Sequence, residues 1–188
     1  IGFVSQPKKE NSRAEERWQG FRAALNEAGI APRADLEIET ALGFGRGAEA
    51  LGVLRDRAPR LDAVFFTSDG WALGALFHCQ RAGIAVPGDI ALVGFDDIEM
   101  ASLAVPALTT IHVPRYEMGW EAGQLLRAEL NGDPVAKRRL DLGFHVELAE
   151  PVEARVGCFD PAQQRLVLLV HVLDVAQPVV AEPELRRA

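Results

Sequence analysis

Residues 86–111, VPGDIALVGFDDIEMASLAVPALTTI, decide the fold that this sequence predicts. The stretch opens with a Pro-Gly turn, Pro87-Gly88, and continues into an apolar run at 90–95 that is typical of a short strand buried on both faces. The run ends on two adjacent carboxylates, Asp96 and Asp97. In an open α/β sheet the carboxyl ends of parallel strands line the ligand crevice. These carboxylates therefore either accept hydrogen bonds from a ligand or cap the following turn.

The residues before this stretch alternate between strand-like and helix-like patterns. Helix starts and stops are marked as well: Ser12 and Glu15 have capping-box spacing, and Gly29 follows the helix that they would open. Alternation of this kind predicts an α/β fold, a doubly wound parallel sheet with right-handed crossovers and helices on both faces. The predicted strands are 1–5, 36–42, 61–67 and 90–95, and the predicted helices are 12–28, 48–57 and 69–82.

Composition and charge restrict the classes of function. The chain has 188 residues, of which 48% are apolar and 25% charged, as in ordinary globular proteins. A net charge of −7 has the wrong sign for a surface that follows nucleic-acid phosphates, so this chain by itself is not expected to bind DNA. It shows neither a membrane-spanning apolar run nor a signal peptide, and Cys79 and Cys158 have no ligand or CxxC spacing. These features predict a reduced, cytoplasmic setting. Because the first residue is Ile, we expect a fragment of a longer gene product.

Catalytic and metal-binding motifs are missing from the sequence. Its four histidines are scattered, and no HExxH, GxSxG or P-loop pattern occurs. The glycine-rich segment 43–48 has neither GxGxxG nor GxxxxGK[ST] spacing, so it predicts a loop before the helix at 48–57. We therefore predict that the chain is not an enzyme and that it holds no cofactor and no metal.

Three separated motifs together resemble the lac repressor (LacI/GalR) family of transcription regulators. They are SRAEERWQGF at 12–21, FTSDGWALG at 66–74, and GFDD at 94–97 followed by PALTTI at 106–111. The resemblance covers roughly residues 1–143. It implies a type I periplasmic-binding-protein-like fold, with one complete effector-binding subdomain at 1–111 and a crossover with a remnant of the partner subdomain at 112–143. The tail at 144–188 is left unassigned.

The resemblance also implies which residues bind an effector. Arg17 matches the family's ligand-contacting arginine, although its pattern alone also fits a solvated helix residue. Phe44 either stacks on the effector or staples the loop beneath it. Ser68 stands where the family usually has Asn, and either Ser68 or Asp69 can cap the following helix. Asp69 is thus either a plain helix cap or a cap that also faces ligand. Asp96 completes the predicted set, and we expect Arg17 and Asp96 to face one crevice with the other three residues on its rim.

The predicted function follows from this resemblance. The chain would be the ligand-sensing domain of a DNA-binding regulator, most often a repressor, that binds a sugar, sugar acid or nucleobase-like effector between its subdomains. Operator DNA would be contacted only through an absent N-terminal helix-turn-helix domain, and family members are usually homodimers. A periplasmic sugar-binding receptor of a transport system, which shares the fold, is the alternative. An upstream signal peptide or an upstream helix-turn-helix would decide between the two.

The end of the chain departs from the family. A helix is predicted at 114–130, with Met118, Ala122 and Leu125 along one apolar stripe. In the family this helix packs on the other subdomain, so the stripe must be exposed, be covered by the tail, or meet another chain. Strict alternation then predicts a strand at 140–148, after which the sequence no longer resembles the family. A strand-like run at 165–175 has no family counterpart, and a reading-frame slip near residue 144 is one explanation.

Overall fold

The computed structural model describes residues 1–134 and 140–149, so the tail strand predicted at 165–175 lies outside the described residues. Four parallel strands form the central sheet, in the order β2-β1-β3-β4. This confirms the α/β class that the alternating pattern predicts. The strands are β1 (Gly2–Ser5), β2 (Glu37–Glu39), β3 (Ala63–Phe66) and β4 (Ala91–Val93).

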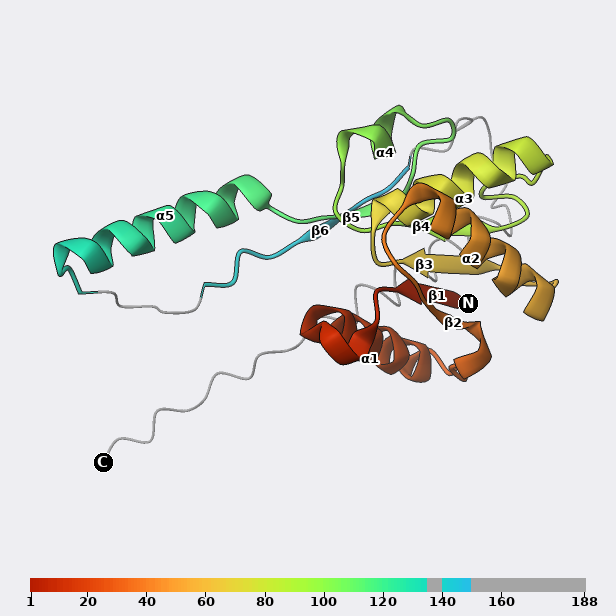
Figure 1. The fold of residues 1–188 in the computed structure, drawn as a ribbon, viewed down its shortest axis with the longest axis horizontal. Helices are drawn as coiled ribbons and strands as arrows, with labels where there is room; N and C mark the ends of the chain where they lie inside the picture. Colours follow the sequence, from red (N-terminus) through yellow and green to blue (C-terminus); the bar gives the residue numbers. More distant parts are fainter. Residues whose placement is uncertain (135–139, 150–188) are drawn as a thin grey trace.

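Helices cover both faces of this sheet (Figure 1). Helix α1 lies on one face, and α2 and α3 lie together on the other. Short 3-10 turns, η1 (Lys8–Glu10) and η2 (Ala34–Leu36), precede α1 and β2. The remaining helices are α4, which follows the β4 loop, and α5, which follows β5. The helices are α1 (Ser12–Glu27), α2 (Phe44–Arg57), α3 (Asp69–Ala82), α4 (Glu99–Leu103) and α5 (Arg115–Asn131).

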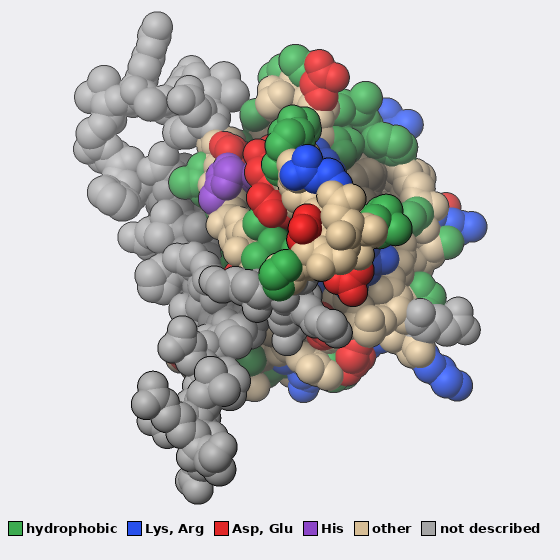
Figure 2. Space-filling model, turned by 90° about the vertical axis from the view of Figure 1, so that its left-hand side faces the viewer, with side chains coloured by type: hydrophobic (Ala, Val, Ile, Leu, Met, Phe, Trp, Pro, Cys, Tyr) green, Lys and Arg blue, Asp and Glu red, His purple; other side chains and the backbone are tan. Residues whose placement is uncertain are grey.

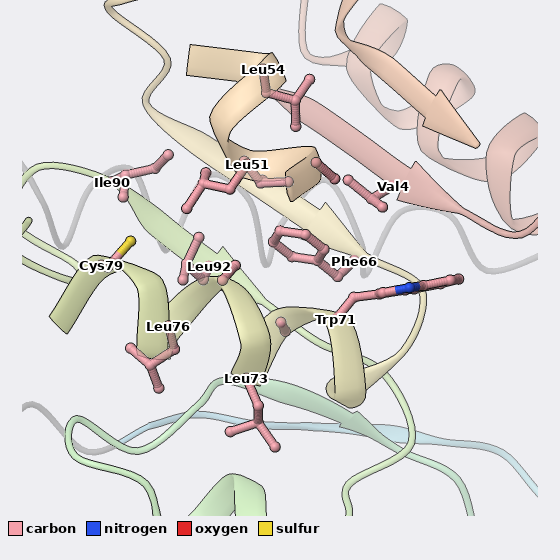
Figure 3. Close-up of a cluster of buried hydrophobic side chains, with 14 of the residues drawn as sticks. Val4, Leu51, Leu54, Phe66, Trp71, Leu73, Leu76, Cys79, Ile90 and Leu92 are labelled. Atoms are coloured by element: carbon pink, nitrogen blue, oxygen red, sulfur yellow. The ribbon is translucent and has the colours of Figure 1, made fainter. Parts of the chain in front are cut away.

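Successive residues of each central strand point to opposite faces and enter different cores. In β1, Phe3 packs with Phe21 of α1, whereas Val4 packs under α2 and α3. In β3, Phe65 joins the α1 side and Phe66 the other side. Both cores are fully desolvated, which is why these strands read as continuous apolar runs rather than as alternating ones. Figure 3 shows the larger core, to which β3, α2 and α3 contribute Phe66, Leu51 and Trp71.

A second, smaller pair of strands lies beside β4. β5 (Thr110–His112) pairs antiparallel with β6 (His145–Glu147). Isolated parallel bridges from Val93 to Thr109 and from Asp96 to His112 join this pair to the end of β4. The β5 segment thus runs alongside the loop that follows β4.

Four local predictions are corrected by the structure. The capping box at Ser12 and Glu15 is wrong, since the side chain of Asn11 caps α1 by accepting from the backbone N–H of Ala14. The helix predicted at 48–57 begins earlier, at Phe44, so the glycine-rich segment forms its first turn. The strand predicted at 36–42 is shorter, because Leu36 belongs to η2 and Leu42 is 61% exposed. Of the strand predicted at 140–148, only the three residues of β6 are extended and paired.

Helix α5 projects away from the sheet (Figure 1). None of its residues is buried, and Met118 is 50% exposed. In the predicted apolar stripe Met118 and Ala122 are exposed and Leu125 is partly buried, and the tail that was expected to offer one possible cover lies largely outside the described residues. Gly132 ends the helix in the left-handed conformation, as the sequence predicts.

Glycines set the distance between α2 and α3. A Cβ on Gly47 would lie 1.9 Å from the carbonyl oxygen of Trp71, and one on Gly74 would lie 1.8 Å from that of Phe44. The two backbones therefore touch at both places, and only glycine fits there. Gly52, also in α2, faces open space.

We expect Gly74→Ala to destabilise the protein by about 1–3 kcal/mol, because the methyl group forces two helices apart in a close-packed core. The matched control is Gly52→Ala, which should stabilise the fold by about 0.5–1 kcal/mol through helix propensity alone. Urea unfolding followed by circular dichroism measures both. Similar changes in the free energy of unfolding of the two variants would contradict the close approach of the helices.

Candidate functional site

Four segments bring the predicted effector residues, four polar and one aromatic, to the carboxyl edge of the parallel sheet, where ligands bind in open α/β folds. The β3–α3 junction contributes Ser68 and Asp69, and the loop after β4 contributes Asp96. Arg17 comes from the second turn of α1, and Phe44 opens α2 after the loop from β2. The five predicted effector residues thus come from segments that meet at this edge.

Arg17, Ser68 and Asp96 are brought together. The guanidinium carbon of Arg17 lies 3.9 Å from the centre of the Phe95 ring, a cation–π contact that holds the side chain over the end of β4. Burial lowers the pKa of Arg17, and the charge of Asp96 opposes that shift. Ser68 donates a hydrogen bond to the Asp96 carboxylate. Arg17 and Asp96 therefore lie near each other beyond the end of β4, and that they face one crevice stays a prediction.

The Asp96 carboxyl has a raised pKa, mainly because it is half-buried and also because the charge of Asp69 is near. Arg17, Arg115 and the hydrogen bond from Ser68 act in the opposite direction. A carboxylate in such a setting is stabilised by any ligand that donates hydrogen bonds to it, since water solvates it incompletely. The site thus offers a strong acceptor beside an arginine donor.

Asp69 lies beneath this group rather than on its surface. Its side chain has no exposed area. One carboxylate oxygen accepts from the Thr110 hydroxyl at 2.6 Å, and the other accepts from the backbone N–H of Ile98 at 2.9 Å. Burial raises the pKa of Asp69, and these hydrogen bonds oppose the shift. The expectation that Asp69 stands on the rim of the crevice is corrected: the helix cap is Ser68, which accepts from the N–H of Gly70.

A glycine makes room for the Asp69 carboxylate. A Cβ on Gly94 would lie 2.0 Å from the Asp69 Oδ1 atom. The glycine of the GFDD motif is therefore needed for the contact of the carboxylate with the end of β4, although the motif by itself gives no hint of this partner.

Phe44 stays 46% exposed at the start of α2. Its backbone is fixed against Gly74 of α3, and the neighbouring loop is fixed by a hydrogen bond from the Trp71 indole to the carbonyl of Ala41. The aromatic ring is thus presented on a rigid support at the carboxyl edge. Its stacking on an effector stays a prediction.

Sequence reasoning missed the residues that shape the loop after β4. Thr110 holds Asp69, and His112 forms a 2.7 Å ion pair or hydrogen bond with Asp97. Arg115 donates to the backbone carbonyls of Asp96 and Asp97. Of these residues, only Thr110 could have been noticed in the sequence, because it is a polar residue in a stretch expected to be buried. A lone arginine or histidine after a strand carries none.

The histidines do not form a metal site among the described residues. The rings of His112 and His145 stack at 4.5 Å, and each histidine has its own carboxylate partner, Asp97 and Glu147 respectively. Figure 2, which views the end from which α5 projects, shows histidine beside acidic side chains.

The periplasmic binding protein-like domain family matches residues 1–146. The chain belongs to this family. Its relatives are regulators of the LacI type: it is 36% identical to the HTH-type transcriptional regulator GntR of Escherichia coli K12 over 126 residues, covering 67% of this chain and 38% of that protein. It is 38% identical to the E. coli repressor CytR over 135 residues, covering 72% of this chain and 39% of that one. The chain thus spans about two fifths of the length of these relatives.

Solved structures agree with the sequence matches. The transcription regulator GntR from Chromobacterium violaceum superposes with a TM-score of 0.74 at 37% identity, over 79% of this chain and 54% of that one. A complex of the regulator CelR with cellobiose gives a TM-score of 0.72 at 35% identity, over 79% and 45%. This chain is accordingly an effector-binding domain of the lac repressor family. Among the described residues, no helix has both the length and the apolar character needed to cross a membrane.

We expect Asp69→Ala to lower the free energy of unfolding by about 1–3 kcal/mol for each buried donor left without a partner. The matched variant is Asp69→Asn, which keeps the shape and one acceptor oxygen and should lose less. Thermal and urea unfolding measure both. If alanine and asparagine proved equally harmless, Asp69 would not hold the loop.

Proposed function

We propose that this chain is the ligand-sensing domain of a DNA-binding transcriptional repressor, which binds a small polar effector and thereby alters operator affinity. The observation that carries the proposal is the grouping of Arg17, Ser68 and Asp96 at the carboxyl edge of the sheet. The named relatives are regulators, which supports a sensing role over a catalytic one.

The chemistry of the site favours a hydroxylated effector such as a sugar or sugar acid, or a nucleobase-like compound. Asp96 accepts hydrogen bonds from hydroxyl or amine groups, Arg17 donates them, and Ser68 does both. Phe44 and Phe95 add apolar surface for the faces of a ring. One solved relative is a complex with cellobiose, and another LacI-family structure, at 28% identity, is a complex with phosphate. Both are polar small molecules.

The division of the chain is part of the proposal. Residues 1–111 form the effector-binding unit, residues 112–143 cross to a partner subdomain, and the tail at 144–188 has no assigned role. Helix α5, which lies in the second part, has no buried residue, as expected of an element whose packing partner is that subdomain. A signal that depends on closure between subdomains requires the effector to bind one state better than the other.

DNA binding would reside elsewhere in the protein. The chain's charge of −7 is unsuited to phosphate contacts, and the relatives are named as helix-turn-helix regulators. A cytoplasmic location follows from that role. The alternative, a periplasmic sugar receptor, shares the fold, and it has less support because the relatives named here are transcription regulators.

The proposal includes a homodimer, for which α3 and the α4 region provide an apolar surface. Leu103 is 71% exposed, Val105 70% and Phe77 38%. The side chain of Gln80 in α3 donates to the carbonyl of Val105, so the two segments lie side by side. A dimer built on this surface would match the two-fold symmetry of an operator.

We expect Asp96→Ala to weaken effector binding about ten- to a hundredfold, the value of a charge-assisted hydrogen bond of about 1.5–3 kcal/mol. Calorimetry would use cellobiose, D-gluconate, D-glucuronate and cytidine as titrants. Asp56→Ala, on the exposed face of α2, is the matched control. Unchanged affinity in Asp96→Ala, or no binding by any compound of the panel, would count against the proposed site.

We expect Leu103→Glu to dissociate the dimer. The substitution removes the burial of one leucine, which contributes about 1.5–3 kcal/mol, and it adds the cost of desolvating a carboxylate in the interface. Ala23→Glu, on the exposed face of α1 across the sheet, should leave association unchanged. Sedimentation velocity over a concentration series measures this. A dimer that survives the first substitution would place the interface elsewhere.

A further inference from the structure

The loop that presents Asp96 has an unusual backbone. Both Asp96 and Asp97 have positive φ angles, 116° and 51°. Residues with side chains rarely occupy this region, and the conformation is strained unless the surroundings enforce it. The backbone at Asp96 determines where its carboxylate points. Whatever holds this turn therefore also positions the acceptor of the effector site.

The N–H groups of this turn are held from the sheet side. The N–H of Asp96 donates to the carbonyl of Ile111 at 3.1 Å, and that of Asp97 donates to the Thr110 hydroxyl at 3.3 Å. The next N–H, of Ile98, donates to the buried carboxylate of Asp69. Three successive N–H groups are thus satisfied by β5 and Asp69.

The carbonyl groups of the same turn are held by Arg115. One terminal nitrogen of its guanidinium donates to the Asp96 carbonyl, and the other donates to the Asp97 carbonyl at 2.9 Å. The planar guanidinium suits two acceptors of fixed spacing, a geometry that lysine does not reproduce. Its charge also acts on the Asp96 carboxylate, whose pKa it lowers against the effect of burial.

Arg115 is the first residue of α5. Since none of the α5 residues is buried, this fork is a direct bridge between the helix and the site loop. A change in the angle of α5 would pull on the two carbonyls, and a change in the turn would push on the helix.

Resting on the proposed function, we propose that Arg115 is a positioning residue: through its fork to the Asp96 and Asp97 carbonyls it sets the Asp96 carboxylate for the effector and links that turn to α5. It acts through the backbone and does not itself need to touch the effector. The charged and titratable groups that surround Asp96 are Asp69 from the β3–α3 junction, Arg17 from α1, Asp97 with its partner His112 from β5, and Arg115 from α5.

Two variants separate the geometry of Arg115 from its charge. Arg115→Met removes both, and Arg115→Lys keeps the charge but loses the fork. Arg127→Met, on the exposed surface of the same helix, is the matched control. The first measurement needs no effector: hydrogen exchange of the Asp97 and Ile98 amides should speed up about tenfold or more in both Arg115 variants and not in the control.

The second measurement is the titration of the Asp96 carboxyl by NMR in the free protein. Arg115→Met should raise the pKa of Asp96 further, because an opposing positive charge is lost, whereas Arg115→Lys should leave it close to that of the parent protein. Binding of D-gluconate or cellobiose, whichever the parent protein binds, should weaken about five- to fiftyfold in Arg115→Met. Since binding requires the ionised carboxylate, affinity is lost as pH falls through this pKa, and in Arg115→Met the loss begins at a higher pH.

The outcomes distinguish this proposal from the proposed function. Unchanged amide exchange and an unchanged Asp96 titration in Arg115→Met overturn the positioning role, whatever the effector is. Faster exchange with unchanged affinity also overturns it, because the turn would then not govern binding. If instead Asp96→Ala binds normally, the proposed effector site fails, and the exchange and titration results still report on the turn alone.

Discussion

The carboxylate of Asp69 has no exposed area, and it connects three segments that are far apart in the sequence. It opens α3, accepts from the loop after β4 through Ile98, and accepts from β5 through Thr110. A buried carboxylate is costly unless its oxygens are fully hydrogen-bonded, so the segments that supply the donors must stay in place. The Asp96 turn rests on this arrangement. The half-buried carboxylate of Asp96 is therefore positioned by the fully buried carboxylate of Asp69.

The arrangement of charge above Asp69 follows the same logic. Asp96 is half-buried and close to Asp69, and both effects favour its protonated form. The arginines at 17 and 115 and the hydroxyl of Ser68 counter them, so the carboxylate is held between opposing influences. Groups tuned in this way are common at binding sites, where a ligand supplies the missing hydrogen bonds. The fold supplies the two aspartates from neighbouring strand ends, which makes the coupling unavoidable.

The fold class and the order of elements could be predicted from the sequence because strands such as 61–67 are apolar enough to be buried on both faces. Helix ends were predictable where glycine takes a left-handed conformation, as at Gly29 and Gly132. The start of α2 was not, since its glycines indicate a loop, and only the contact with α3 explains them. In the site too, the role of some residues depends on tertiary contacts that the sequence does not show. The motif positions of Arg17, Ser68 and Asp96 were readable, but the roles of Asp69 and Arg115 depend on partners from distant segments.

The paired glycine contacts between α2 and α3 restrict how this unit can respond to a ligand. Sliding motions between helices rely on interfacial side chains that change rotamer, and here backbone meets backbone at Gly47 and at Gly74. The two helices therefore cannot slide past each other without a clash of backbone atoms, and we expect them to move together. Any rotation of α5 relative to these helices has to be absorbed where the chain passes between α5 and the β5–β6 pair, which it does twice, before α5 and again before β6. We therefore expect residues 113–114, the shorter of these two connections, to take up part of such a rotation.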